Sequence, residues 1–373
     1  QRRGKRRTGG PVKDYSCHRS WLRTSGALTP VLAAALFLTA CDTTPSQNGF
    51  ELPQASASSA AKASVVLARD SWEFGSAKGE ALTTKSFRIY TTANSGLNSR
   101  LPAFLEASLI HNRTALGDLP APVDRMETFV LANRSEWSRC VQMIWAEKAE
   151  PYLNIQRGAV TAGGKSVLYD IGPRDTLVLA AHEGWHQFAQ STFKEQLPTW
   201  LDEGIAVYME GFRSEAGTDR FVFLPWANTE RFDRLREAHA AGALMSLREV
   251  MSSTPTRQIS SSGNGGDALT WYAQAWALIH WLNEGNNGSM HAGLHQIVAD
   301  ASNGMILKRV EDKLGPKAAV FVRQKRPGPE IWQTYFGTDT DAANDSYQDF
   351  ISRVVQTGSR DRVIAGRSPL ESN

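Results

Sequence analysis

Two histidines and a glutamate with helical spacing form the clearest chemical pattern in the chain. His182 and His186 are four residues apart, Glu183 follows the first of them, and the apolar run 177–181 precedes all three. Four residues make about one turn of an α-helix, so both imidazoles project from one face and can share a metal ion. Glu183 is offset by about 100° around the helix, close enough to reach a metal-bound water without being a ligand. The spacing is typical of a zinc hydrolase.

A second motif supplies a third ligand for such a site. Residues 200–206 read Trp-Leu-Asp-Glu-Gly-Ile-Ala, and a helix is expected to begin just after Pro198, which places Glu203 on it. Catalytic zinc keeps three protein ligands and one water, and two histidines with one carboxylate are a common set. Asp202 and Glu210 are interpreted as solvated or supporting acids, not as ligands. The alternative, two surface histidines and a solvated acid on an amphipathic helix, does not account for the second motif.

Together the two motifs resemble those of the gluzincin metallopeptidases, in which a glutamate on a downstream helix completes the zinc site. Residues 200–206 are similar to the Trp-Leu-x-Glu-Gly-x-Ala segment of the zinc aminopeptidases, and the pattern over about residues 85–285 resembles the bacterial peptidase-MA-like family. The resemblance implies zinc bound by His182, His186 and Glu203, with Glu183 as general base. Thermolysin-like members carry an aspartate one turn after the zinc glutamate, where this chain has Val207, so what orients the histidines stays open.

These residues support hydrolysis by a metal-activated water. Zinc lowers the pKa of bound water, Glu183 takes its proton, hydroxide attacks the scissile carbonyl, and Glu183 passes the proton to the leaving amine. The region 271–281 offers two donors for the oxyanion, Tyr272 and His280, which are eight residues apart and so near one helix face. The resemblance to aminopeptidases favours Tyr272. The alternative is that Tyr272 is a core aromatic residue.

Apolar periodicity predicts the elements that position these residues. The expected strands are 86–90, 126–131, 158–161 and 166–169, the last two joined in a hairpin by Gly163-Gly164. The expected helices are 97–109 and 173–188, followed by a mainly helical region beyond Trp200 that is interrupted by a loop at 260–266. Strands first and helices later favour an α+β fold.

The resemblance refines this fold class to a zincin-like metallopeptidase with a small N-terminal mixed sheet, an active-site helix and a mainly helical C-terminal part. The strand Ser166–Tyr169 is expected to be the edge strand that pairs with an extended substrate through backbone hydrogen bonds. The alternative is an ordinary sheet edge.

The N-terminal residues have the order of an export signal with a lipidation site. A basic stretch precedes an apolar run from Ala27 to Leu38, which at 12 residues is too short to span a membrane. Leu38-Thr39-Ala40-Cys41 resembles the lipobox of bacterial lipoproteins, which implies a lipid on Cys41. The alternative is a chance cysteine after an ordinary signal sequence. By resemblance to enterobacterial sorting rules, Asp42 favours the inner membrane.

Composition and charge set the remaining limits. The chain has 373 residues, of which 41% are hydrophobic and 21% charged, as expected for a globular protein. Residues 1–40 hold eight Lys/Arg and one acid, so the overall charge of +3 belongs to this end and nothing favours nucleic-acid binding. Besides Cys17 and Cys41 only Cys140 is present, which excludes a disulfide scaffold. The predicted domains are a signal peptide (1–40), a flexible tether (41–66), a zincin-like peptidase domain (67–305) and a C-terminal helical extension with a disordered tail (306–373).

The sequence therefore predicts a zinc-dependent peptidase, anchored by lipid to a bacterial membrane on the extracytoplasmic side, that acts on a peptide or protein. The alternative is a non-catalytic zinc-binding lipoprotein that holds peptides or envelope partners. Glu183 favours the peptidase, because a binding module needs the ligands but not the base. The substrate, the choice between endo- and exo-cleavage, the membrane and the oligomeric state stay open.

Overall fold

A computed structural model describes residues 65–155, 158–215, 218, 220–254, 266–325 and 328–371. The predicted signal peptide with Cys41, nearly all of the predicted tether, and the predicted loop before Gly266 lie outside these residues. Within the described ranges, no helix is both long and apolar enough to cross a membrane.

The N-terminal part is built on a six-stranded mixed sheet. Its strands are β1 (Ala68–Phe74), β2 (Ala77–Thr83), β3 (Phe87–Thr91), β4 (Met126–Leu131), β5 (Val160–Ala162) and β6 (Lys165–Tyr169), in the order β1-β2-β3-β4-β6-β5. The central strands β3, β4 and β6 are parallel, and the flanking pairs are antiparallel. The predicted strands are all present. The β1–β2 hairpin was not predicted, because the outer strand β1 is polar and mostly exposed, without the alternation that marks a half-buried strand.

The strand expected at the sheet edge lies inside the sheet, so that prediction was wrong. β6 pairs with β4 on one side and with β5 on the other, which makes the three-residue strand β5 the edge. Ser166 to Tyr169 are buried without interruption, as expected of a strand that is paired on both sides and covered on both faces. Gly163 and Gly164, with φ of 60° and 74°, form the tight turn between β5 and β6.

Helices make up most of the rest of the molecule. The helices before residue 200 are α1 (Ser95–Thr114), α2 (Arg134–Trp145), the 3₁₀ turn η1 (Ala146–Lys148), α3 (Glu150–Leu153), α4 (Pro173–Thr192) and α5, which starts at Thr199 and ends at Met209. They are followed by α6 (Thr229–Ala240), α7 (Leu247–Ser252), α9 (Gly266–Gly288), α10 (His291–Asn303), α11 (Ile306–Leu314), α12 (Pro316–Lys325), α13 (Gly328–Phe336), α14 (Thr340–Val354) and α15 (Ser359–Ile364). A small hairpin of β7 (Phe212–Ser214) and β8 (Phe221–Phe223) follows α5. The fold is α+β, as predicted.

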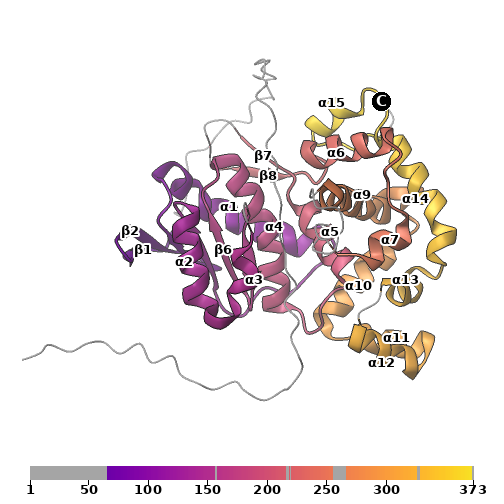
Figure 1. Cartoon of the computed structure of the whole chain (residues 1–373), viewed down its shortest axis with the longest axis horizontal. Coiled ribbons are helices and arrows are strands. Elements are labelled where there is room, and N and C mark those ends of the chain that lie inside the picture. The colour runs from indigo at the N-terminus through magenta and orange to yellow at the C-terminus, as the bar shows by residue number, and fades with distance from the viewer. Residues whose placement is uncertain are drawn as a thin grey trace, which may run out of the picture. The chain divides into compact units, whose positions relative to one another are not determined.

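Helix α4 connects the sheet to the helical region. It packs against β4, β5 and β6 and also against α1 and α5, and α5 in turn packs against α9 (Figure 1). A second, smaller core that contains the buried Cys140 lies between the sheet and α2. The helix that carries the histidines and the helix that carries Glu203 are therefore neighbours inside the main core.

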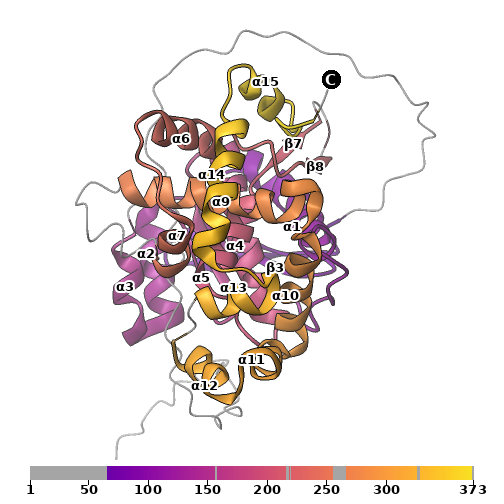
Figure 2. The same ribbon diagram turned by 90° about the vertical axis from the view of Figure 1, so that its right-hand side faces the viewer.

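The C-terminal helices belong to the same core. Trp332 of α13 and Tyr347 of α14 are fully buried and pack on Trp281 of α9, and α14 runs beside α7 and α9 (Figure 2). Helical structure continues to Ile364, so the disordered tail predicted for the C-terminal end is not seen among the described residues. Several residues of the segment 306–371, from Ile306 to Val363, belong to the main core.

Candidate metal centre

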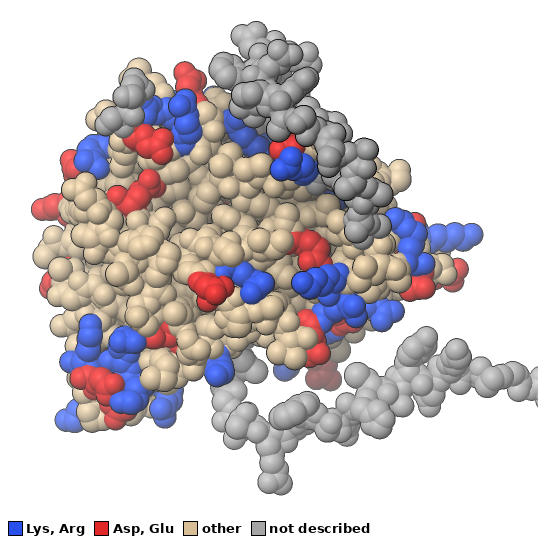
Figure 3. All heavy atoms as spheres, turned by 180° about the vertical axis from the view of Figure 1, so that it is seen from behind, with Lys and Arg blue, Asp and Glu red and all other residues tan. Residues whose placement is uncertain are grey.

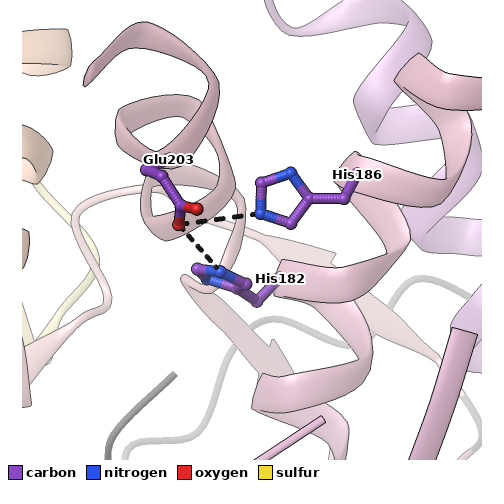
Figure 4. Close-up of side chains that lie close together, drawn as sticks. All are labelled: His182, His186 and Glu203. Carbon is purple, nitrogen blue, oxygen red and sulfur yellow. Dashed lines mark ion pairs between the residues drawn. The ribbon is translucent and has the colours of Figure 1, made fainter. Parts of the chain in front are cut away.

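The structure brings together the three residues that the sequence selected as metal ligands. The Nε2 atoms of His182 and His186 on α4 lie 3.5 and 3.7 Å from one carboxylate oxygen of Glu203 on α5. One ligand atom from each residue lies within 4.8 Å of the other two, and all three side chains are buried (Figure 4). This group could hold a metal ion.

Local sequence explains where the two helices begin and how α5 packs on α9. Pro173 starts α4 after Gly172, whose φ of 109° suits glycine, and Pro198 directly precedes α5. A Cβ at Gly204 would lie 3.0 Å from the side chain of Ile279 and 3.2 Å from the carbonyl oxygen of Ala275. The glycine next to Glu203 thus allows α5, which carries the third candidate ligand, to pack closely on α9.

The inward-facing atoms of the group have no hydrogen-bond partner in the protein. Nε2 of His182, Nε2 of His186 and both carboxylate oxygens of Glu203 are buried and make no hydrogen bond. A buried polar atom without a partner costs about 1–3 kcal/mol, so proteins rarely leave several in one place. Two imidazole nitrogens and a carboxylate form a donor set suited to a divalent transition metal, and a bound ion would satisfy these atoms.

A carboxylate that the sequence placed outside the ligand set holds His182. Nδ1 of His182 lies 2.9 Å from Glu210 Oε1, and Glu210 also accepts hydrogen bonds of 3.0 and 3.2 Å from Arg231 and of 2.8 Å from Asn228. Burial by itself raises the pKa of Glu210, but the charge of Arg231 and the contact with His182 lower it overall. Glu210 is therefore a buried anion and not a solvated acid.

A different carboxylate holds His186. Nδ1 of His186 lies 3.2 Å from Asp202 Oδ2, and Asp202 Oδ1 accepts a hydrogen bond of 2.9 Å from Trp185 Nε1. The side chain of Asp202 is 17% exposed. With an acid at each Nδ1, the network assigns the proton of each neutral imidazole to Nδ1 and leaves the Nε2 lone pair free to bind a metal. Glu210 and Asp202 therefore orient the two histidines, a function that the sequence, with Val207 in place of an aspartate, left without an assigned residue.

Electrostatics tie the three ligand candidates together. Burial lowers the pKa of His182, but the carboxylates of Glu203, 3.5 Å away, and of Glu210 raise it to about 9. The pKa of His186 also ends well above its usual value, because the charges of Asp202 and Glu203 outweigh burial. Burial raises the pKa of Glu203, yet the neighbouring histidines bring it down to about 2. The negative charge of the carboxylates around the two imidazoles thus favours the binding of a positively charged group, a proton or a metal ion.

Glu183 lies beside the ligand group but is not part of it. Its side chain is fully buried, and neither carboxylate oxygen has a hydrogen-bond partner. Burial raises its pKa, and the positive charge of the two histidines only partly opposes this. Its backbone carbonyl lies 3.4 Å from the hydroxyl of Thr161, so the edge strand β5 runs next to it. A carboxylate with a raised pKa beside a metal group suits a general base.

The two candidate oxyanion donors lie in different surroundings. Tyr272 is fully buried, with its ring centre 6.2 Å from that of His182 and 5.4 Å from the guanidinium of Arg231. Burial, and then the charge of Glu203, raise its pKa well above the usual value. His280 instead stacks on Trp226 at 3.6 Å and contacts Glu284 through Nδ1 at 3.0 Å. The structure thus places Tyr272, and not His280, against a candidate ligand.

Two supporting residues, Arg231 and Asn228, were not predicted from the sequence, whereas Glu210 was predicted as a solvated or supporting acid. Glu210 follows Glu203 by seven residues, about two helical turns, so its position near the ligands had a sequence signal. Arg231 and Asn228 had none, because α6 reaches Glu210 only through tertiary packing.

The segment of the chain that matches a known family contains this site. Residues 177–303, about one third of the chain, match a family described as "Protein of unknown function (DUF1570)". None of the curated proteins compared with the chain matches it. The matched segment runs from the first turns of α4 to the end of α10 and contains His182, Glu183, His186, Glu203 and Tyr272.

Proposed function

We propose that this chain is a gluzincin-type, zinc-dependent peptidase with a zincin-like fold. Zinc would be bound by His182, His186 and Glu203. The observation that carries the proposal is the pair of free carboxylate oxygens on Glu183, which are buried beside the ligand group and outside it. A site that only binds metal has no use for such a group, whereas hydrolysis requires a base next to the metal.

Each residue then has a distinct part in hydrolysis. Bound zinc supplies Lewis acidity, which makes water a nucleophile near neutral pH. Glu183 accepts the proton of that water at a carboxylate oxygen and delivers it to the leaving amine. The hydroxyl of Tyr272 donates a hydrogen bond to the oxyanion, since its ring packs next to His182. Glu210 and Asp202 hold the imidazoles in the binding orientation.

The substrate that fits is an extended peptide. β5 ends the sheet, and its Thr161 lies next to the backbone of Glu183, so a peptide that added to this edge would pass the base. Backbone pairing tolerates many side chains, so we expect a broad range of peptide substrates. Because the ligand candidates and Glu183 are buried, a substrate reaches them only after parts of the chain that cover them move.

The proposal includes a lipid on Cys41 that anchors the protein to a membrane of the bacterial envelope, on the extracytoplasmic side. Its support is the order of basic, apolar and small residues before Cys41. Cys41→Ser should move the protein from the membrane to the soluble fraction in cell fractionation. A variant that sediments with membranes as the parent does would show that something else anchors it.

Burial of the whole cluster favours one alternative. A non-catalytic lipoprotein that binds zinc and an envelope partner would also hold its metal away from solvent, as closed structural sites do. Glu183→Gln separates the two functions, because it removes the base and keeps the ligands.

The test is metal analysis of the purified protein with a peptide-library cleavage assay on parent, Glu183→Gln and Tyr272→Phe. Glu183→Gln should keep one zinc per chain and lose about 10²–10⁴ in rate. Tyr272→Phe should lose on the order of 10²–10³. Cleavage by Glu183→Gln at the parental rate would refute the mechanism. Zinc binding and peptide binding without cleavage by any of the three proteins would establish the binding lipoprotein.

A further inference from the structure

Helix α12 presents an apolar pair that nothing in the described structure covers. Val320 and Phe321 are 50% and 45% exposed, although both are large apolar residues. Ala319 and Val322 on the opposite side of the same helix are buried in the main core. The inward side of α12 therefore anchors it to the domain, and the outward side leaves Val320 and Phe321 in solvent.

Cations surround this pair. Lys317 lies one turn before it, Arg323 and Lys325 lie one turn after it, all three are exposed, and α12 contains no acid. No ion pair links these three side chains to another residue of the described ranges, in contrast to α11, where Lys308 pairs with Asp312. Three cations without an ion pair, placed around two exposed apolar side chains, can contact anionic lipid headgroups while the apolar pair enters the boundary below them.

The charge of this region differs from that of the rest of the domain. Residues 306–325 hold six Lys/Arg and two acids, a net charge of +4, whereas residues 65–371 as a whole carry −3. In Figure 3, Lys and Arg spheres gather with a few acids at the lower left, where α11 and α12 of Figure 1 lie after the half turn. α12 makes contacts mainly with α11 and α13, and it lies at the end of the domain in Figures 1 and 2.

We propose that the outward face of α12 docks on an anionic lipid bilayer, with Phe321 and Val320 in the headgroup region and Lys317, Arg323 and Lys325 against the lipid charges. The charge complementarity favours anionic lipid, and the apolar pair explains why lipid is preferred to a purely acidic polymer. The contact goes beyond peptidase activity and requires neither zinc nor the lipid predicted on Cys41.

The test is site-directed spin labelling of the full chain. In a Cys17→Ser/Cys41→Ser background, Val320→Cys receives a nitroxide, while Cys140 stays unlabelled because it is buried and burial raises the pKa of its thiol to about 12. The matched control is Ile364→Cys on α15, a position 43% exposed. Both proteins carry the same basic N-terminal segment, so adsorption through that segment affects them equally.

With vesicles of phosphatidylglycerol and phosphatidylcholine, the label at 320 should gain oxygen accessibility and lose nickel-chelate accessibility several-fold. The label at 364 should stay aqueous, and pure phosphatidylcholine should have no effect. Adding Lys317→Glu, Arg323→Glu and Lys325→Glu should weaken the membrane contact reported by the label at 320 by about 100-fold or more, at roughly fivefold for each cation lost.

Four results would overturn the proposal. The label at 320 could stay aqueous, or the label at 364 could be protected equally. Soluble poly-glutamate could protect position 320 as well as vesicles do, which would identify an acidic polypeptide as the partner. Dipolar broadening at 320 without vesicles would show instead that a second copy of the chain covers this face.

Discussion

The two histidines of the candidate metal group, His182 and His186, are held by carboxylates in different surroundings. Glu210, behind His182, is buried and neutralised by the buried Arg231. Asp202, behind His186, is partly exposed and has the indole of Trp185 as its neutral partner. Water can replace a lost contact only in the second case. Both carboxylates therefore contact an imidazole Nδ1 in the same way, but their removal should differ in its effect on zinc affinity and on stability.

The two supports also differ in how many helices they join. The His182 support joins α4, α5 and α6, so it stabilises both the ligand and the packing of three helices. The His186 support joins only α4 and α5. Four predictions test the contrast, from the largest expected effect to the smallest.

Loss of the ligand that both histidines share should have the largest effect. Glu203→Ala removes the carboxylate that faces both Nε2 atoms, so zinc occupancy should fall from about one per chain to near zero. Metal analysis after gel filtration measures this. Equal zinc content in Glu203→Ala and the parent would rule out the three-ligand assignment.

Loss of the cation that neutralises Glu210 should have the second-largest effect. Arg231→Met leaves Glu210 buried without its cation, which should cost about 3–5 kcal/mol of unfolding free energy and weaken zinc binding by about 10–100-fold. Urea denaturation and zinc competition measure the two effects. The matched control is Arg309→Met, because Arg309 is 36% exposed and pairs with Asp300 away from the metal group. Unchanged zinc affinity in Arg231→Met would show that the His182 support is purely structural.

His111, a partly buried histidine without a neighbouring acid, should respond to pH in the opposite way to His182 and His186. Nε2 of His111 has no partner, and burial lowers its pKa to about 4. In the unfolded chain its pKa is about 6.5, so its contribution to stability is complete above that value and is lost as the pH falls toward 4. The loss should be about 1–2 kcal/mol at pH 5. His111→Phe should remove this part of the acid sensitivity in urea titrations between pH 7 and 5; an unchanged pH dependence would contradict the assignment.

Loss of the partly exposed carboxylate of Asp202 should have the smallest effect. Asp202→Asn should leave zinc bound and weaken it by no more than about tenfold, the low end for a residue that holds a ligand. Glu210→Gln is the matched comparison, and zinc competition on both variants measures the difference. If Asp202→Asn costs as much affinity as Glu210→Gln, exposure does not distinguish the two supports.

Much of the fold and of the candidate site could be predicted from local pattern. The strand at 126–131 and the helix that starts at Pro173 follow from runs of apolar and β-branched residues and from a proline in the first helical turn. The edge strand was misplaced, because periodicity shows that 166–169 is a strand but cannot show how many neighbours it has. The β1–β2 hairpin was missed because an exposed strand carries no apolar alternation.

The sequence by itself determined the candidate ligands, since four-residue spacing on a helix puts His182 and His186 on one face whatever surrounds them. It also indicated Glu203 and Glu183, whose residue types and positions match the chemistry. Only the tertiary structure decided that Glu210 and Asp202 hold the imidazoles, that Arg231 neutralises Glu210, and that Tyr272 and not His280 lies beside His182. The physical reason is that helical spacing is a local property of the backbone, whereas these contacts join separate helices and depend on the packing of the whole core.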